Sequence, residues 1–326
     1  MLNAKKTKSV LIGTMAVSML ISGCGVKKDS DDKAMLEIGD SITEVNSDGH
    51  KNLLDIKHDG RNFYQYAPGN DLLIASGFYC SNVSIYNMET GAKTVVGFPK
   101  TDGGFGGFEY EGQKFSGHNA WYEEGKVSIY ASDTENKLVA FTFDCETEEL
   151  ADTTFYDIER PVFVRDAGNF IVYVKSVSVK VQNDKYEFQY DLNIFNKLTG
   201  EDKAVVRDIG KKQGRGYDLI VLNDDKSKVL FTKTKDDAPV LFECNIPSGE
   251  IREVYKCGKE DCITGFTYAL GSNKIYLRYG KIFYGLFDYR CLPNQTMVIT
   301  TDGRNYKLHS SLINGYEIHN TGIVVY

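Results

Sequence analysis

The sequence predicts an all-β fold, a β-propeller of four-stranded blades. Nearly every apolar run of the 326-residue chain is short, alternating and rich in Val, Ile, Tyr and Phe, which is typical of strands. Long stretches with a 3.6-residue helical period are absent, and the loops carry Gly, Asn and Asp. A turn motif recurs about every 50 residues, the length of one propeller blade.

The chain begins with a leader of the bacterial lipoprotein type. Three lysines precede an apolar stretch over residues 10–21, which is too short to span a membrane as a helix. The next tetrapeptide, Ile21-Ser22-Gly23-Cys24, resembles the lipobox, whose cysteine is alkylated with diacylglycerol and becomes the new N-terminus. We therefore expect a signal peptide over residues 1–23 and a lipid anchor at Cys24, on the extracytoplasmic side of the cell membrane. A membrane-spanning anchor and an ordinary secretory signal are the alternatives.

Without its leader the chain is strongly acidic. Of 38 Lys and Arg, 35 remain against 45 Asp and Glu, a net charge near −10, so nucleic acid is not expected as a partner. Residues 25–33 are too polar to bury. We assign residues 24–50 to the lipidated cysteine and a flexible tether, with folded structure beginning around Met35, and residues 51–326 to the propeller.

Four related turns mark the blades. Each follows an apolar strand and precedes a short one: Asn87 to Gly91, Asn196 to Gly200, Asn245 to Gly249 and a degenerate copy, Asp144 to Glu148. Their last residues are spaced by 57, 52 and 49 positions. In a propeller such a turn joins the two outer strands of a blade, and its last residue must tolerate a positive φ.

A second marker predicts how the ring closes. The segment Asp59 to Phe63 is echoed 243 residues later by Asp302 to Tyr306. If this turn leads from an outer strand to the next inner strand, the N-terminal strand completes the last blade and leaves no free sheet edge. The predicted blades lie near residues 61–97, 103–155, 159–208, 215–256 and 263–301, with a composite of 304–326 and 51–58. The composite blade is short, so five or seven blades are the alternatives to six.

The pattern of a strand, an N-x-x-T/S-G turn and a short strand resembles that of bacterial lipoprotein and periplasmic propellers of the TolB-like, YncE-like and pyrroloquinoline-quinone types. The resemblance covers nearly all of residues 51–326 and implies a fold rather than a function, because the motif recurs in unrelated propellers. Quinone-type repeats carry a Trp after the Thr-Gly, whereas this chain has valines there and a single Trp, Trp121. We therefore expect no cofactor.

Motifs of known chemistry are absent from the sequence. It contains no G-x-S-x-G, no H-E-x-x-H and no calcium or phosphate loop, and its five histidines lack metal-ligand spacing. The first functional hypothesis is a non-enzymatic binding or scaffold module of the cell envelope that recognises a protein, peptide or glycan. The alternative is an envelope polysaccharide lyase or glycosidase whose carboxylates come from different blades.

Four arginines are candidate ligand-binding residues, because the blade assignment places them around one mouth of the central channel: Arg61, Arg160, Arg215 and Arg304. Converging guanidinium groups could bind a carboxylate or phosphate. The alternative is that each is a solvated turn residue beside an acidic neighbour.

Two further features are candidates. Cys257 and Cys262 lie close enough in sequence for a local disulfide, with free thiols as the alternative. The aromatic-rich loop Phe98 to Gly112 and the long insertion Ser176 to Gln189 could recognise a partner or could pack their own bases.

Overall fold

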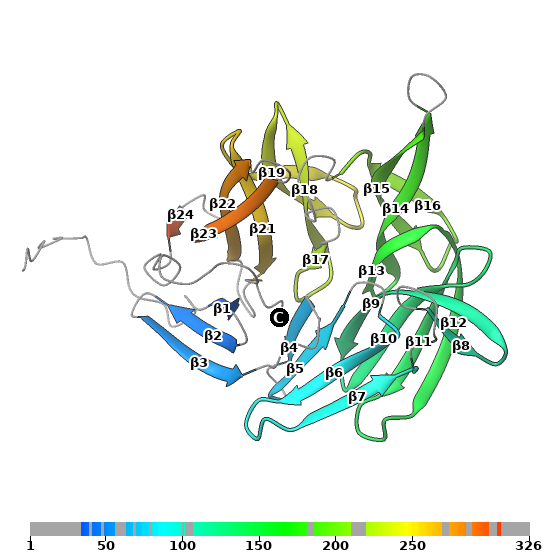
Figure 1. Ribbon diagram of the computed structural model, residues 1–326. Helices are drawn as coiled ribbons and strands as arrows, with labels where there is room; N and C mark the ends of the chain where they lie inside the picture. The colour runs from blue at the N-terminus through cyan, green and yellow to red at the C-terminus, as the bar shows by residue number, and fades with distance from the viewer. Residues whose placement is uncertain are drawn as a thin grey trace, which may run out of the picture. The chain divides into compact units, whose positions relative to one another are not determined.

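A computed structural model of the chain (Figure 1) describes residues 34–38, 41–46, 49–55, 63–67, 70–77, 80–99, 101, 107–180, 186–209, 220–268, 274–284, 289–299 and 305–307. The chain divides into two units, Met1–Ser30 and Asp31–Tyr326, and all described residues belong to the second. The predicted leader and Cys24 therefore lie outside the described residues.

The described residues form a series of antiparallel sheets in a propeller arrangement, and no helix occurs among them (Figure 1). The first sheet contains β1 (Ala34–Ile38), β2 (Ser41–Asn46) and β3 (Gly49–Asp55). The second contains β4 (Phe63–Ala67), β5 (Leu72–Ser76), β6 (Asn82–Asn87) and β7 (Lys93–Gly97). The third contains β8 (Gly107–Tyr110), β9 (Gln113–Glu123), β10 (Lys126–Ser132), β11 (Lys137–Asp144) and β12 (Leu150–Glu159).

The remaining sheets each have four strands. The fourth contains β13 (Pro161–Ala167), β14 (Phe170–Lys180), β15 (Tyr186–Asn196) and β16 (Asp202–Val206). The fifth contains β17 (Val221–Leu222), β18 (Lys228–Lys235), β19 (Ala238–Asn245) and β20 (Ile251–Lys256). The sixth contains β21 (Asp261–Tyr268), β22 (Ile275–Tyr284), β23 (Tyr289–Ile299) and β24 (Asn305–Lys307).

Neighbouring sheets meet along their inner strands. β4 contacts β9, β9 contacts β13, β13 contacts β17 and β17 contacts β21. Within each sheet the strands follow in chain order from this inner position outward, except that β8 adds a short strand on the far side of β9. The predicted propeller of four-stranded blades is therefore confirmed.

The middle strands are apolar on both faces because each blade is covered by two neighbours. On β11, Val139 and Phe141 belong to a core cluster shared with the second sheet. Leu138 and Ala140, which alternate with them, point the other way and belong to a cluster shared with the fourth sheet. Side chains alternate along a strand, so one strand contributes to two separate cores.

The marker turns have the predicted place and structure. In the first, the Oδ1 atom of Asn87 accepts a hydrogen bond from the backbone N–H of Thr90 at 2.8 Å, and Gly91 has a φ of +71°. The turn joins β6 to β7, the two outer strands of the second sheet. In the degenerate copy Glu148 adopts a φ of +62° without being a glycine, which explains why the fourth marker is harder to recognise.

The pairing differs from the expected ring closure in two places. Residues 34–50, which we assigned to the tether, lie largely in β1, β2 and the start of β3, and β3 pairs with β2. At the other end, β24 pairs with β23, so residues 305–307 extend the sixth sheet instead of joining residues 51–58. Residues 308–326 lie outside the described residues.

Candidate functional site

Two side-chain amides join the inner strands of neighbouring sheets. Gln65 on β4 is buried, donates from Nε2 to the carbonyl of Tyr122 on β9 at 2.8 Å, and accepts from the N–H of Tyr122 at 2.9 Å. Asn119 on β9 is also buried and bonds both backbone groups of Val164 on β13, at 3.0 and 2.9 Å. Each amide bonds both backbone polar groups of a buried residue in the next sheet, and the N–H groups of Tyr122 and Val164 are satisfied in this way. We call these two contacts the amide joints.

A buried arginine lies beside the second amide joint. Arg165 on β13 has no exposed surface, and its guanidinium carbon lies 4.1 Å from the ring centroid of Trp121 and 4.2 Å from that of Phe163. Its Nη1 atom donates to the carbonyl of Val164 at 3.0 Å. Burial lowers the pKa of Arg165 to about 9, because the charged form is removed from water. The faces of the two aromatic rings partly compensate the guanidinium for its lost contacts with water.

Trp121 packs against side chains from several sheets. It contacts the core cluster of the third and fourth sheets, which includes Tyr130 and Tyr173, and also the cluster of the fifth and sixth sheets, which includes Val221 and Phe266. The single Trp of the chain therefore lies where the inner strands converge. From the sequence, we used Trp121 only as evidence against a quinone-type repeat.

An ion pair joins the third sheet to the fifth. Glu123, at the end of β9, pairs with Lys226 in the turn between β17 and β18. That turn is held by its own polar residues, since the Oδ1 atom of Asp225 accepts from the N–H and hydroxyl of Ser227 at 3.0 and 2.5 Å. Both ion-pair side chains remain partly exposed, at 31% for Lys226 and 38% for Glu123, so solvent weakens the pair.

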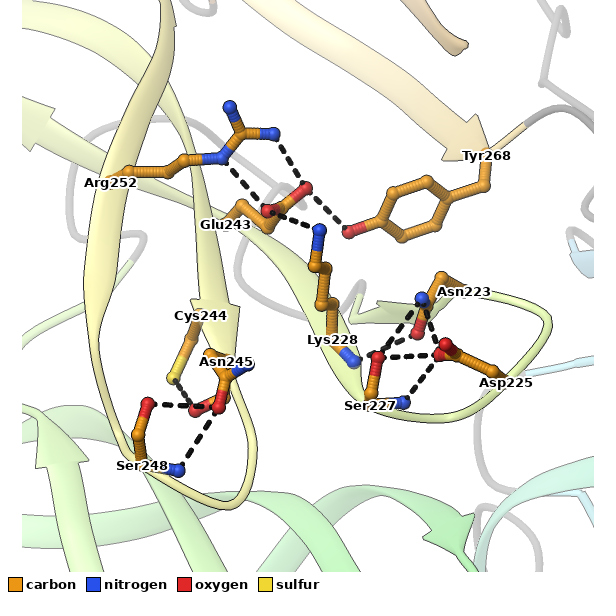
Figure 2. A network of polar contacts seen from close by, with 10 residues as sticks. All are labelled: Asn223, Asp225, Ser227, Lys228, Glu243, Cys244, Asn245, Ser248, Arg252 and Tyr268. Carbon is orange, nitrogen blue, oxygen red and sulfur yellow. Dashed lines mark hydrogen bonds and ion pairs between the residues drawn. The ribbon is translucent and has the colours of Figure 1, made fainter. Parts of the chain in front are cut away.

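A second polar centre connects the fifth and sixth sheets (Figure 2). Glu243 on β19 is buried and accepts two hydrogen bonds from Arg252 on β20, at 2.8 and 3.0 Å. The hydroxyl of Tyr268, at the end of β21, donates to the same carboxylate at 3.1 Å, and Lys228 on β18 lies 3.5 Å away. Burial alone would raise the pKa of Glu243, but Arg252 and Lys228 hold it below its usual value. The paired geometry is that of a strong, oriented salt bridge.

Of the five histidines, His50 on β3 and His118 on β9 lie among the described residues, and His118 contacts the neighbouring strand β10. Its Nε2 atom lies 2.7 Å from the hydroxyl of Ser132, and burial lowers its pKa to about 4. The ring is therefore neutral near pH 7.

Of the four candidate arginines, only Arg160 lies among the described residues. It is exposed, in the turn between β12 and β13, with a φ of +53°. Its backbone accepts from the N–H of Ser176 at 3.0 Å and donates to the carbonyl of Asn136 at 2.9 Å. Arg61, Arg215 and Arg304 lie outside the described residues, so their convergence remains a prediction.

The predicted local disulfide does not form. Cys257 is a buried free thiol, whereas Cys262 belongs to a disulfide, so its partner is another cysteine. Cys257 directly follows β20, which ends at Lys256, whereas Cys262 lies in β21 of the next sheet. Burial raises the pKa of Cys257 to about 12 and that of Cys244 to about 11, which makes both thiols poor nucleophiles.

The aromatic-rich loop packs its own base where it is described. Phe98 stacks on the buried Phe108 with ring centroids 4.5 Å apart, and Tyr110 lies 5.6 Å from Phe98. These rings surround Phe141 in the core shared by the second and third sheets. Phe105 lies outside the described residues.

The long insertion is instead a continuation of two strands. β13 pairs with β14 only as far as Lys175, and β16 pairs with β15 only as far as Leu192. Beyond these points Ser176–Lys180 pairs with Tyr186–Tyr190, and we call this two-stranded extension the β-arm. Figure 1 shows it running out past β13 and β16.

The β-arm has a fixed base and an exposed aromatic residue. At the base, the N–H of Ser176 bonds Arg160 and the carbonyl of Tyr190 accepts from Ile209 at 2.8 Å. Further out, the side chain of Phe188 is 66% exposed. A paired strand that presents a large apolar side chain to solvent is suited to binding.

The buried charges were missed by sequence reasoning. Arg165 and Glu243 each stand in an apolar strand, where alternation does not reveal whether a polar residue points outward or into a joint between blades. Among the described residues, no group of three or more His, Cys, Asp or Glu side chains is placed to hold a metal ion. The part of the chain that the structure covers also contains no helix long and apolar enough to cross a membrane.

No protein family model matches the chain, and no curated protein matches it. A chain from the crystal structure of a nidogen/laminin complex aligns with a TM-score of 0.53 and 8% identity, covering 90% of this chain and 98% of that chain. The putative TolB from Agrobacterium tumefaciens also aligns with a TM-score of 0.53 and 8% identity, covering 89% of this chain and 98% of that one. Similarity at this identity shows the propeller fold alone.

Proposed function

We propose that the chain is a membrane-anchored lipoprotein of the cell envelope whose propeller is a non-enzymatic binding or scaffold module for a protein, peptide or glycan. The observation that carries the proposal is the β-arm, which extends five residue pairs beyond its sheet and exposes Phe188. Exposed aromatic residues on rigid supports are common at the centre of binding surfaces.

The buried polar groups indicate that side chains of the inner strands have a structural role in joining the blades. Gln65 and Asn119 bond the backbone of the next sheet, Arg165 lies between two aromatic rings, and Glu243 is held by Arg252 and Tyr268. These groups join blades to each other. Blades joined in this way hold their outer strands and the base of the β-arm in place, as a scaffold requires.

The anchor rests on the leader sequence. The lysines, the short apolar stretch and the motif ending at Cys24 support cleavage and lipidation at that cysteine. In cells of a bacterial host fed a radiolabelled fatty acid, we expect label on the wild-type chain and its recovery with membranes. Cys24→Ser should abolish both, while Cys145→Ser, which alters a half-buried free thiol, should change neither. Labelling of Cys24→Ser would contradict the anchor.

Photo-cross-linking tests the binding role directly. A benzophenone amino acid at position 188 of the full-length chain should give a discrete adduct in intact cells. The same group at position 95, which is 51% exposed on β7, is the matched control and should give none. Absence of an adduct at position 188, or hydrolysis of envelope glycans by the purified full-length protein, would overturn the proposal.

A further inference from the structure

β12 is the longest outer strand among the described sheets. It has 10 residues, against 7 in β3, 6 in β20, 5 in β7 and β16 and 3 in β24. It ends its sheet, and within the described residues no strand pairs with its outer side. A long outer strand offers a row of backbone N–H and C=O groups to any chain that can lie alongside.

The side chains of β12 alternate between the core and solvent, and the exposed set includes one large apolar residue. Ile158 is buried, and Tyr156 packs against the core of the third and fourth sheets. Phe155, Asp157 and Glu159 alternate with them and face solvent, with exposures of 63% for Phe155 and of 84% and 61% for the two acidic side chains. A phenylalanine this exposed on a strand is suited to cover an incoming side chain.

Acidic residues outnumber basic ones around this edge. Between residues 144 and 159 the sequence has seven acidic residues and no basic one. Lys137 on the neighbouring β11 pairs with both Asp157 and Glu159, so one positive charge faces two carboxylates. The edge therefore favours a basic partner and repels acidic strands, including other copies of this acidic chain.

We propose that the free edge of β12 docks an extended basic segment of a partner protein, which adds to the third sheet as a further strand. Backbone hydrogen bonds supply the affinity, as in other cases of strand addition. Phe155 covers an apolar side chain of the segment, while Asp157 and Glu159 select Lys or Arg at alternate positions. The inference rests on the proposed binding role and adds the chemistry of the partner.

The position of β12 connects this edge to the β-arm. The strand ends at Glu159, and the next residue, Arg160, accepts a hydrogen bond from Ser176 at the base of the arm. A segment lying along β12 therefore ends beside the arm that carries Phe188. One partner can contact both features.

A synthetic probe tests the edge without knowledge of the partner. The full-length protein in detergent micelles is titrated with a short fluorescent peptide that carries one Val and two Lys at successive alternate positions, so that the three share one face, with Thr between them, and with the same peptide N-methylated at alternate residues. N-methylation leaves the charge unchanged and blocks backbone pairing along one edge. We expect the methylated peptide, and a peptide with Glu in place of both Lys residues, to bind at least about tenfold more weakly.

Matched variants locate the site on the protein. Phe155→Ser should weaken binding about tenfold, and Asp157→Asn with Glu159→Gln should weaken it and reduce its salt dependence. Val95→Ser, at an exposed apolar position on the outer strand β7, should bind as wild type. Trp121 fluorescence verifies that each variant is folded.

Equal affinity for the methylated and unmethylated peptides, or unchanged affinity of Phe155→Ser, would overturn the docking edge. These outcomes are separable from failure of the proposed function. If position 188 still cross-links to a cellular component while the probe shows no dependence on the edge, the binding role stands and the inference about β12 is wrong.

Discussion

The side-chain amide of Asn119 is hydrogen-bonded to both backbone polar groups of Val164, at 3.0 Å to the carbonyl and 2.9 Å from the N–H. Asn119 lies on the inner strand of the third sheet and Val164 on that of the fourth. One side chain thus acts as a short strand partner between two blades that share no backbone ladder. Gln65 makes the same contact with Tyr122 one sheet earlier.

Removal of this amide joint should destabilise the propeller. Asn119→Ala leaves the N–H of Val164 buried without a partner, whereas its C=O keeps the bond from Arg165, and we expect the free energy of unfolding to fall by about 2 kcal/mol. Ser116→Ala, at an exposed position of the same strand, is the control and should change it by less than about 0.5 kcal/mol. Urea denaturation followed by circular dichroism measures both. Equal stability of the two variants would show that the joint contributes little.

The contribution of Arg165 to folding stability should depend more on the shape of its side chain than on its charge. Arg165→Lys keeps a positive charge but cannot lay a flat guanidinium between Trp121 and Phe163, so we expect a loss of about 2 kcal/mol. Arg165→Met, which removes the buried charge and keeps a long side chain, should stay within about 1 kcal/mol of wild type. The emission of Trp121, the single Trp, should shift in both variants. A lysine variant as stable as wild type would contradict this account.

The Glu243 centre should make stability sensitive to acid. The folded-state pKa of Glu243 is depressed, so its contribution is complete above the unfolded value near 4.3 and is lost as the pH falls through the folded value. Glu243→Gln should cost about 2 kcal/mol at pH 7, because Arg252 loses a charged partner. It should also show a smaller further loss of stability below about pH 4.

An exposed ion pair of the same sheet is the control for Glu243. Asp236 pairs with Lys256 at 2.8 Å, but its side chain is 70% exposed. Asp236→Asn should therefore change the free energy of unfolding at pH 7 by no more than about 0.5 kcal/mol. An effect of Asp236→Asn as large as that of Glu243→Gln would mean that burial is not what makes the Glu243 centre important.

His118 should make the folding stability depend on pH at higher pH values than Glu243 does. The unfolded chain takes up a proton near pH 6.5, whereas the folded protein does so only near pH 4, so stability falls as the pH drops between these values. The loss should reach about 3 kcal/mol at most. Denaturation midpoints of wild type and His118→Gln, measured from pH 7.5 to 4, should differ in slope across this range. Parallel slopes would show that His118 is not shielded from protonation.

Local features of the fold could be predicted from the sequence. The marker turns depend on residues within five positions of each other, and Asn87, Asn196 and Asn245 all accept bonds from the backbone of their own turns. Their spacing predicted where the outer strands of each sheet meet. The insertion from Ser176 to Gln189 was also located, although it was expected as a loop and most of its described residues are paired strand.

Predictions that depended on pairing between distant segments were less successful. Cys257 and Cys262 are close in sequence, yet Cys257 follows the last strand of the fifth sheet, Cys262 lies in the first strand of the sixth, and they do not bridge. Arg165 and Glu243 gave no signal, because burial on both faces of a blade removes the usual contrast between apolar and polar positions. We predicted that the four candidate arginines converge because of the blade assignment, and only Arg160 lies among the residues that the structure describes.

The sequence by itself determined the strands, the turns and their period, because these depend on side-chain alternation and on backbone preferences of a few adjacent residues. It also carries the leader that predicts an anchor at Cys24, which stays a prediction. Only the tertiary structure decided which polar residues join the blades, where β1 to β3 and β24 pair, and which edge and arm remain exposed. Those outcomes depend on contacts between residues far apart in the chain, such as Asn119 with Val164, and local preferences do not specify them.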